Sequence, residues 1–325
     1  MADYKLEFSK GTKFLVTGGA GFIGSNLVEK ILEMECEVTV LDNFSTGEME
    51  NIKEFVNNGS FALIKGDVRN LEDCQMACKN ADYVLHQAAL GSVPRSIKDP
   101  IATNDSNLCG TLNMMVAARD NNVKRFVYAS SSSVYGDIRE LPKREDKIGK
   151  PLSPYAISKL SGELYGKNFF DLYGLPAIGL RYFNVYGKKQ NYNSVYAAVI
   201  PRFIEKLLRD ESPVINGDGN QSRDFTYVEN VVDANLAACL AEQDAFGEAF
   251  NIGNEGRITI NELYSKLCEL LHKDIEPIYG PERCGDVKHS NADISKAKSI
   301  LKYRPLYSFD EGISLCIDWY KNHLQ

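Results

Sequence analysis

Strand-like and helix-like segments alternate along the first half of the chain, and this alternation limits the possible folds more than any other feature. Helical patterns are clearest at Phe22–Met34, Ala102–Asn121 and Pro154–Leu172. Short apolar runs lie between them and predict six buried strands: Lys13–Thr17, Glu37–Leu41, Phe61–Lys65, Asp82–His86, Arg125–Ala129 and Pro176–Arg181. A strand–helix–strand repeat favours parallel pairing with right-handed crossovers. The sequence therefore predicts an α/β fold with a doubly wound parallel sheet.

The pattern becomes looser after Tyr186, where polar residues, prolines and glycines interrupt it. Further helices are expected at Val228–Ala241, Ile260–His272 and Phe309–His323, with a short strand at Ala249–Ile252. A chain of 325 residues can form one large or two modest domains. We predict a larger domain from residues 1–186 and 226–254, and a smaller α/β domain that binds substrate from residues 187–225 and 255–325.

Composition argues against several classes of function. The formal net charge is −7 and the isoelectric point is near 5.3. Nucleic acid and anionic membranes offer little binding energy to such an acidic surface. The sequence contains no apolar run of about 18 residues and no signal-peptide pattern, and its eight cysteines form no C-x-x-C pair. Scattered cysteines are typical of reduced thiols, so we expect a cytoplasmic protein.

A glycine-rich turn, Thr17-Gly18-Gly19-Ala20-Gly21-Phe22-Ile23-Gly24, joins the first predicted strand to the first predicted helix. Gly18 permits a sharp turn, Gly21 lets the backbone approach a pyrophosphate, and Gly24 lets the helix pack closely on the strand. The start of the helix then presents unpaired N–H groups to the phosphates. Glycines also occur in ordinary turns, but this order of strand, turn and helix indicates a Rossmann-type dinucleotide site.

The ends of the next two strands carry carboxylates. Asp42 lies where an acidic residue accepts the two ribose hydroxyls of a dinucleotide. The residues after it, from Asn43 to Ser45, include no arginine to attract a 2′-phosphate, so NAD is favoured over NADP. Asp67 and Val68 follow the third strand, where adenine would lie. For Asp67, a hydrogen bond to adenine and a cap of the following helix remain equally open.

Tyr155 and Lys159 are four residues apart on a predicted helix and so share one face. An ammonium beside a phenol lowers the phenol's pKa from about 10 and makes it a competent base. The run of serines from Ser130 to Ser133 ends the fifth strand, at the edge where doubly wound sheets bind ligands. A serine-rich turn would explain the loop alone, but it would not explain why all these elements occur together.

Taken together, T-G-G-A-G-F-I-G, the serines before V-Y-G, S-P-Y-A-x-S-K and R-Y-F-N-V-Y-G resemble the extended short-chain dehydrogenase/reductase superfamily over the whole chain. Further segments narrow the resemblance; they are residues 196–201, 215–219, 222–225 and 285–290. They are most similar to the bacterial UDP-N-acetylglucosamine 4-epimerases of polysaccharide biosynthesis, relatives of UDP-galactose 4-epimerase. The resemblance implies reversible epimerisation at C4 of a UDP-hexose, with UDP-GlcNAc and UDP-GalNAc preferred.

In the implied mechanism, Ser131, Tyr155 and Lys159 form the catalytic triad. Tyr155, assisted by Ser131, takes the C4 hydroxyl proton while hydride passes to tightly bound NAD. The 4-keto sugar then rotates about its bond to the diphosphate and receives the hydride on its opposite face. The resemblance adds cofactor contacts to those found from the glycine turn and the strand ends: Asn43, Gln87, Ala88, Ala89, Asn107, Tyr155, Lys159 and Tyr182. For Asn107, the alternative is a helix cap.

Some related enzymes are disfavoured by the sequence, whereas others remain as alternatives. Nucleotide-sugar 4,6-dehydratases carry Thr-Asp-Glu where this chain has Ser131-Ser132-Ser133, and serines cannot supply the acid and base of that reaction. UDP-glucuronate decarboxylases usually carry a glutamate at the place of Ser133. UDP-glucuronate 4-epimerases share the serine run and are the closest competitor. A non-catalytic NAD-binding regulator is a distant alternative, because such proteins commonly lose the tyrosine or the lysine.

The resemblance also implies the contacts of the UDP-sugar. Arg223, Arg283 and Asn184 would hold the diphosphate and Asp286 the uridine ribose, whereas Val199 and the segment from Val214 to Asn216 would flank the uracil. The sugar would meet the serines from Ser131 to Ser133. A small residue at Ser290 and another at Gly91 would leave room for a 2-acetamido group, to which Gln190 could hydrogen-bond.

Two further expectations concern metals and partners. The four histidines show no metal-ligand spacing, so no metal is expected. The two long helices, Ala102–Asn121 and Pro154–Leu172, carry broad apolar stripes that include Leu108, Leu112, Met115, Leu160, Leu164 and Phe169. In similar proteins these helices form a four-helix bundle between two subunits, so a homodimer is expected.

Overall fold

The computed structural model describes residues 6–192, 197–282 and 288–323. Its centre is a seven-stranded sheet in the order β11-β6-β5-β4-β1-β2-β3, and all neighbouring strands pair in parallel. The strands are β1 (Lys13–Thr17), β2 (Glu37–Asp42), β3 (Phe61–Lys65), β4 (Tyr83–His86), β5 (Arg125–Ser131), β6 (Ala177–Tyr182) and β11 (Ala249–Ile252). Strands β2 and β3 are added on one side of β1, whereas β4 and the later strands are added on its other side. This confirms the doubly wound parallel sheet expected from the sequence.

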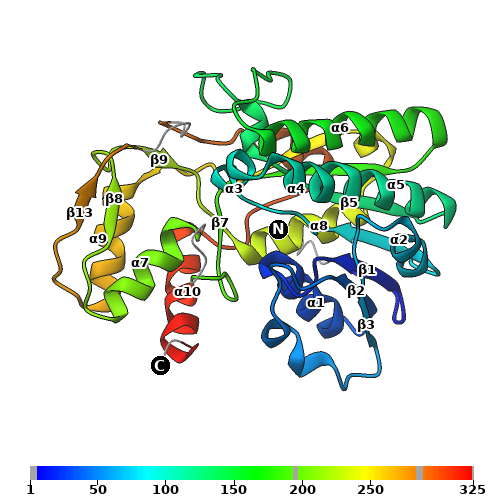
Figure 1. Ribbon diagram of the computed structural model, residues 1–325, viewed down its shortest axis with the longest axis horizontal. Coiled ribbons are helices and arrows are strands. Elements are labelled where there is room, and N and C mark those ends of the chain that lie inside the picture. Colours follow the sequence, from blue (N-terminus) through cyan, green and yellow to red (C-terminus); the bar gives the residue numbers. More distant parts are fainter. Residues whose placement is uncertain (1–5, 193–196, 283–287, 324–325) are drawn as a thin grey trace.

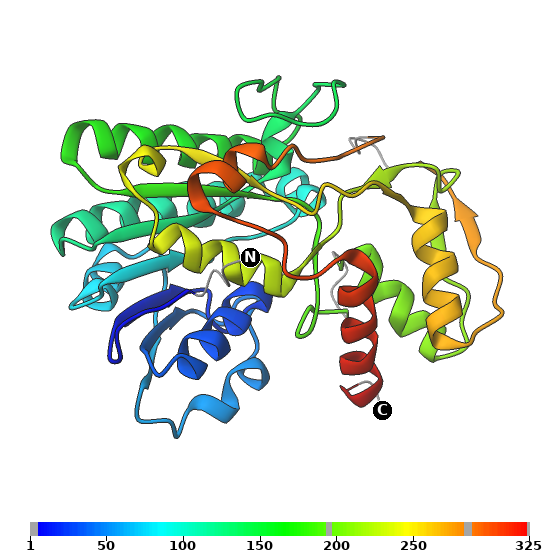
Figure 2. The same cartoon turned by 180° about the vertical axis from the view of Figure 1, so that it is seen from behind.

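Helices cover both faces of this sheet (Figure 1). Helices α1 (Phe22–Glu33) and α8 (Val228–Cys239) pack together on one face. The other face carries α2 (Leu71–Cys78), α5 (Gly110–Asp120) and α6 (Pro154–Tyr173), with the short α3 (Val93–Lys98) and α4 (Pro100–Asn104) against α6. The view from behind in Figure 2 shows α1 and α8 on the near side of the strands. Both faces are therefore buried, as the apolar strand sequences require.

A smaller lobe lies beside the carboxyl ends of the strands (Figure 1). Its helices are α7 (Val199–Leu208), α9 (Ile260–Leu271) and α10 (Phe309–His323), and they enclose a second apolar core. Short strand pairs complete it: β7 (Val185–Tyr186) with β10 (Thr226–Tyr227), β9 (Ser222–Arg223) with β12 (Ile258–Thr259), and β8 (Val214–Asn216) with β13 (Ile278–Gly280). The regular helix α7 was not expected from the sequence.

The predicted boundary between the two domains differs from the packing at one segment. Residues 255–325 were assigned to the smaller domain, but Ala292, Ile294, Ala297, Leu301 and Tyr303 are buried in the core of the large sheet. The chain therefore returns to the sheet before it forms α10 in the smaller lobe.

None of the helices in the described parts of the chain is long and apolar enough to cross a membrane.

The expected helix Ala102–Asn121 is not regular. A π-helical turn, Asp105–Cys109, separates α4 from α5. Within this turn, the side chain of Asn107 accepts a hydrogen bond from the backbone N–H of Leu90 (2.7 Å) and donates to its carbonyl (3.3 Å). This contact joins segments far apart in sequence, and no local periodicity could have indicated it.

Candidate functional site

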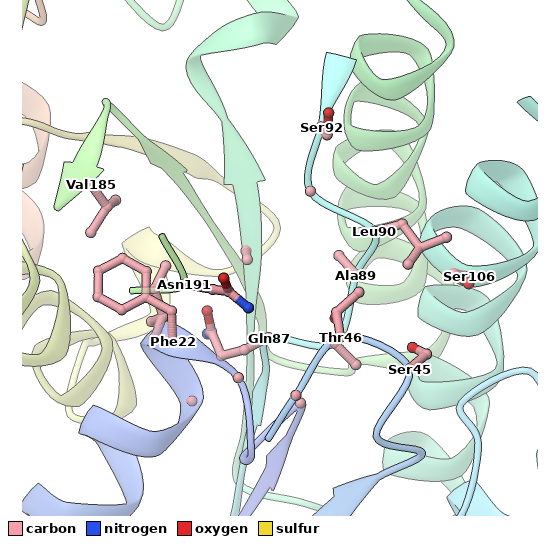
Figure 3. Close-up of a pocket in the computed structure, with 18 of the residues that line it drawn as sticks. Phe22, Ser45, Thr46, Gln87, Ala89, Leu90, Ser92, Ser106, Val185 and Asn191 are labelled. Carbon is pink, nitrogen blue, oxygen red and sulfur yellow. The ribbon is translucent and has the colours of Figure 1, made fainter. Parts of the chain in front are cut away.

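A cavity of about 880 Å³ opens where the strands of the large sheet end. The glycine turn, the loops after β2 and β4, the end of β5, the start of α6 and the segment after β7 line it. Figure 3 shows side chains from these separate elements around one space, among them Phe22, Gln87, Ala89 and Asn191. Parallel pairing produces this convergence, because it places the carboxyl ends of all strands at one edge.

The glycine turn fits a dinucleotide. A Cβ atom on Gly18 would lie 2.8 Å from the backbone nitrogen of Ala88, and one on Gly24 would lie 2.1 Å from the carbonyl oxygen of Gly18. Gly18 also has a φ of +67°, which favours glycine. The N-cap of α1, Gly21, has no side chain to bond the first N–H groups, and the first turn holds no acidic residue. The backbone donors of this turn therefore remain available to phosphate oxygens in the cavity.

Asp42 is held in place by backbone groups. Its Oδ2 accepts from the N–H of Ala20 (2.9 Å) and its Oδ1 accepts from the N–H of Phe44 (2.8 Å). The carboxylate is largely buried and lines the cavity. Each carboxylate oxygen has a second lone pair, so the orientation seen here leaves acceptor capacity for ribose hydroxyls.

Helix α6 places Tyr155 at the same edge of the sheet. The side chain of Ser153 caps the helix by accepting from the N–H of Ala156 (3.1 Å), and Pro154 occupies the first turn. Tyr155 therefore lies in the first turn of the helix and faces the end of β5. Its phenol is hydrogen-bonded to the side chain of Ser131, the last residue of that strand.

Lys159 lies one turn further along α6. Its Nζ donates to the carbonyl oxygen of Ala129 (2.7 Å) and lies 5.9 Å from the centre of the Tyr155 ring. Burial lowers the pKa of Lys159 to about 8. Burial also raises the pKa of Tyr155, and the hydrogen bond from Ser131 lowers it only in part. The structure brings the three predicted catalytic residues together, but the net shift of the phenol's pKa is upward rather than downward, because burial outweighs the hydrogen bond from Ser131.

A neutral polar network forms part of the cavity wall. The Tyr182 hydroxyl donates to Gln87 Oε1 (3.1 Å) and accepts from Asn235 Nδ2 (2.9 Å), and Gln87 donates to Asn235 (3.0 Å). Nearby, His86 is hydrogen-bonded to Thr17 (2.7 Å) and Thr111 (3.0 Å), and burial lowers its pKa to about 3. The side chains of Gln87, Tyr182 and His86 at the strand ends are therefore uncharged at neutral pH. They add no charge that would oppose the binding of a ligand in the cavity.

Most of the predicted cofactor residues line the cavity. They are Gly18, Gly21, Phe22, Ile23, Gly24, Asp42, Asn43, Val68, Gln87, Ala88, Ala89, Tyr155, Lys159 and Tyr182. Asn107 does not line it and acts on the loop at Leu90 instead. Asp67 does not line it either; its carboxylate pairs with Arg69 (2.7 Å) and accepts from Asn43 Nδ2 (2.8 Å). The cap considered for Asp67 is supplied by Asn70, whose side chain accepts from two N–H groups at the start of α2.

The predicted substrate residues divide into two groups. Gly91, Ser131, Ser132, Asn184 and Gln190 line the cavity. Others lie outside its lining, namely Ser133, Val199, Val214, Asn216, Arg223 and Ser290. Arg283 and Asp286 are not among the described residues. The cavity therefore joins the residues predicted to bind the cofactor to residues expected around the sugar.

Several lining residues were missed by sequence reasoning, and three groups of them come from separate elements. The loop after β2 contributes residues 44–48 and Asn51, helix α3 contributes Arg95, and the segment after β7 contributes Lys189 and Asn191. The position of this loop directly after β2 could have indicated that it lines the cavity, because every strand of the large parallel sheet ends at the edge where the cavity opens. No local pattern indicated that Lys189 and Asn191 would reach the cavity from the border of the smaller lobe.

A doubly wound sheet with this glycine turn and strand-end carboxylate defines a dinucleotide-binding protein. Comparison with known families is more specific. Residues 14–253 match the NAD dependent epimerase/dehydratase family, and the chain belongs to this family. The resemblance stated from the sequence motifs is thus confirmed, and so is NAD as the cofactor.

Individual relatives cover nearly the whole chain. UDP-glucose 4-epimerase of Mycolicibacterium smegmatis is 34% identical over 313 residues, which are 96% of this chain and 99% of that protein. The structure of UDP-N-acetylglucosamine 4-epimerase from Methanobrevibacter ruminantium M1 in complex with UDP-N-acetylmuramic acid has a TM-score of 0.92 at 41% identity, and the match covers 97% of this chain and 99% of that one. UDP-glucuronic acid 4-epimerase from Bacillus cereus, solved with UDP-glucuronic acid and NAD, has a TM-score of 0.89 at 33% identity, with 96% and 100% covered.

Proposed function

We propose that this protein interconverts the C4 epimers of a UDP-hexose, with UDP-GlcNAc and UDP-GalNAc preferred. The observation that carries the proposal is a single cavity lined by both the glycine turn and the Ser131, Tyr155 and Lys159 group. A base and a dinucleotide site that share one space are what oxidation and re-reduction of a sugar carbon require. Similarity to 4-epimerases over nearly the whole chain supports the same conclusion.

The residues of the chain have distinct tasks in this reaction. The glycine turn would hold NAD, which would supply the hydride acceptor and donor for C4. Tyr155 holds and releases the C4 hydroxyl proton at its phenol oxygen, and Ser131 donates a hydrogen bond to that oxygen. Lys159 orients Tyr155 and Ser131 through its hydrogen bond to the carbonyl of Ala129. It also supplies positive charge near the phenolate.

The preference for a 2-acetamido sugar rests on space and on one acceptor atom. A Cβ atom on Gly91 would meet nothing within 4 Å, so this part of the cavity wall is open. The Gln190 Nε2 donates to the carbonyl of Val185 (3.1 Å), whereas its buried Oε1 has no partner among the described residues. An acetamido N–H is a suitable donor for this oxygen, because a buried unpaired acceptor is costly.

Epimerisation of UDP-glucuronate is the second candidate. The run Ser131-Ser132-Ser133 favours it, because hydroxyl groups can bond a sugar carboxylate. Of these three serines, Ser131 and Ser132 line the cavity. The similarity to the Bacillus cereus enzyme supports this candidate as well.

One assay separates these candidates. The purified protein is incubated with UDP-GlcNAc, UDP-Glc and UDP-GlcA in separate reactions without added cofactor, and the products are followed by NMR. We expect UDP-GalNAc to form fastest and the Tyr155→Phe variant to be inactive. Formation of UDP-galacturonate or CO2 from UDP-GlcA as the main reaction would contradict the sugar preference. An active Tyr155→Phe variant would refute the assigned base.

We also propose that the smaller lobe binds the UDP moiety. Arg223 and Arg283 would hold the diphosphate, and Asp286 the uridine ribose. Because the chain has a net charge of −7, an anionic ligand must be bound by local cations such as these arginines. Substitution of Arg223 by leucine is expected to raise KM for the UDP-sugar with little change in kcat.

A homodimer through α6 is proposed as the assembled form. Ile157 and Leu164 on α6 are 54% and 66% exposed, and Ile101 on the adjacent α4 is 74% exposed. Exposed apolar groups of this size, gathered on neighbouring helices, favour contact with a partner. Two residues of the expected stripe, Met115 and Phe169, do not contribute, because the protein's own core buries them.

A further inference from the structure

Helix α6 and strand β5 are joined at a third point beyond those made by Tyr155 and Lys159. One turn after Lys159, the carboxylate of Glu163 accepts a hydrogen bond from Ser130 Oγ at 2.5 Å. The three α6 residues follow each other at four-residue spacing and therefore share one face of the helix. On β5, Ser130 lies between the residue that bonds Lys159 and the residue that bonds Tyr155.

The carboxylate of Glu163 is itself fixed by Arg181 of β6. The Nε of Arg181 donates to Oε1 (2.9 Å) and its Nη2 donates to Oε2 (2.7 Å). Both side chains are buried, with 4% and 8% of their surfaces exposed for Arg181 and Glu163. The pair raises the pKa of Arg181 despite burial. A two-pronged contact of this kind defines both the distance and the angle between the groups.

The arginine is anchored in turn to other elements. Its Nη1 donates to the Tyr135 hydroxyl (2.9 Å), which donates to Asn251 Oδ1 of β11 (2.6 Å). The Asn251 side chain then donates to the carbonyls of Lys143 (2.9 Å) and Asp293 (3.0 Å). Glu163 thus joins α6 to three neighbouring strands through polar contacts, and a fully satisfied buried network of this kind is rigid.

We propose that Glu163, held by Arg181, is a positioning residue for the reaction. Through Ser130 it fixes the end of β5, and with it the carbonyl that orients Lys159 and the hydroxyl that bonds Tyr155. Ser130 lines the cavity, but Glu163 and Arg181 do not. The ion pair of Glu163 and Arg181 therefore acts on the reaction indirectly. The inference rests on the proposed function, since it concerns the base of that reaction.

A positioning role and a merely structural role have different consequences. If the network only stabilises the fold, its loss lowers the melting temperature but leaves the turnover of the folded protein unchanged. If it positions Tyr155 and Lys159, its loss lowers kcat, leaves KM for the UDP-sugar nearly unchanged and shifts the pH dependence of kcat. The pH profile responds because the proton affinity of the phenol depends on the distances to its neighbours.

The first variant is Ser130→Ala, which removes the contact between Glu163 and β5 and keeps the ion pair intact. We expect kcat to fall about 10-fold, KM to change less than about two-fold and the acid limb of the profile to move up by about one pH unit. Glu163→Gln should lower kcat further, by about 10- to 100-fold, because it also leaves Arg181 without a counter-charge. Asp171→Asn is the matched control, since it neutralises an exposed carboxylate of α6 that pairs with Lys167.

Circular dichroism and the amount of bound NAD show whether each variant is folded. If Glu163→Gln fails to fold, Ser130→Ala decides alone. A folded Ser130→Ala protein with the kcat and pH profile of the unmodified chain would overturn the proposal. Arg181→Lys should recover part of the turnover lost in an Arg181→Gln variant, because lysine restores the charge but not the two-pronged geometry.

A second readout separates this inference from the proposed function. The phenol at position 155 is replaced by 3-fluorotyrosine, and its ionisation is followed by ¹⁹F NMR in the full NAD-containing protein. Ser130→Ala should raise the pKa of this phenol, whichever sugar the protein accepts. An unchanged pKa would overturn the positioning role, whereas absence of turnover with all three UDP-sugars would overturn only the proposed function.

Discussion

Tyr155 and Lys159 are neighbours on one face of α6, and burial shifts their pKa values in opposite directions. Burial raises the pKa of the phenol and lowers the pKa of the ammonium to about 8. Because the two groups are neighbours, we expect the first proton to leave the pair near pH 8, with the remaining proton held by either the phenol or the amine. In the proposed reaction, this singly protonated pair would accept the C4 hydroxyl proton.

The rate should consequently rise with pH along an acid limb at or below about pH 8, because the positive nicotinamide ring favours loss of the proton. Lys159→Met removes the group that ionises first, so the buried phenol must ionise alone. We expect the limb to move above pH 10 and kcat at neutral pH to fall by about 10²- to 10³-fold. Lys167→Met, which changes an exposed lysine of α6, is the control. An unshifted limb in Lys159→Met would contradict this assignment.

Single residues were predictable from sequence where a motif determines both position and chemistry. Asp42 was placed at the cavity because it ends a strand, and Tyr155 because it shares one face of a predicted helix with Lys159. The sign of the pKa shift at Tyr155 was not predictable. Helical spacing sets which residues are neighbours, but burial and the bond from Lys159 to Ala129 depend on the strand against which the helix packs.

At the scale of elements, the segment after β7 joins the two lobes beside the cavity. Lys188 and Lys189 both pair with Glu29 of α1, at 2.8 and 2.9 Å. Asn191 Nδ2 donates to Glu48 Oε1 (2.7 Å), and the Tyr320 hydroxyl of α10 donates to the carbonyl of Gln190 (2.6 Å). Although burial raises the pKa of Glu29, the two lysines lower it overall, so its carboxylate is charged at neutral pH.

This segment should slow the release of NAD, because Lys189 and Asn191 form part of the cavity wall. Glu29→Gln removes the shared partner of both lysines and should speed the loss of bound NAD several-fold. Glu33→Gln, which changes an exposed ion pair of the same helix, should have no effect. Release is measured by the decay of NAD in the protein fraction after dilution. If both variants retain NAD equally, the ion pairs do not hold the segment closed.

Elements with strong local patterns were predicted within a few residues, as β1, α1 and α6 demonstrate. The missed elements depend on distant contacts. The π-helical turn at Asp105–Cys109 is tied to Leu90, and α7 buries Ile200, Phe203, Ile204 and Leu207 in a core that includes α9 and α10. In both cases the partner is separated by many residues of sequence, so a local window did not contain the necessary information.

At the scale of the whole molecule, Asp224 connects the smaller lobe to the large sheet. Its buried carboxylate accepts from the N–H groups of Asn254 (2.9 Å) and Ala292 (3.0 Å). Burial raises its pKa to about 6. Between pH 4 and 6 the unfolded chain loses this proton and the folded chain keeps it, so the free energy of unfolding falls as pH rises.

Asp224→Asn removes this titration. The difference in unfolding free energy, wild type minus variant, should therefore fall by about 1–3 kcal/mol between pH 4 and 7. Denaturant unfolding at several pH values measures it, and Asp171→Asn, at an exposed site, should show no such trend. A constant difference for Asp224→Asn would mean that this carboxyl is ionised in the folded chain throughout the range.

The proposed homodimer gives a second prediction at this scale. Leu164→Glu places a charge on the exposed face of α6, where a charge inside an apolar interface would be desolvated. We expect the unmodified protein to sediment as a dimer at micromolar concentration and the variant as a monomer. Leu315→Glu, on an equally helical but distant site in α10 with 44% exposure, should remain dimeric. A monomeric unmodified protein would end the proposal.

The segment from Lys188 to Asn191 has a consequence for cofactor economy. A protein that performs the proposed reaction recovers its NAD in the oxidised form at the end of each cycle. If the segment also keeps the dinucleotide in place, one molecule of NAD acquired after synthesis serves the chain for its lifetime. The rate of sugar conversion would then be independent of the NAD⁺/NADH ratio in the surrounding solution, which governs dehydrogenases that exchange their cofactor in every cycle.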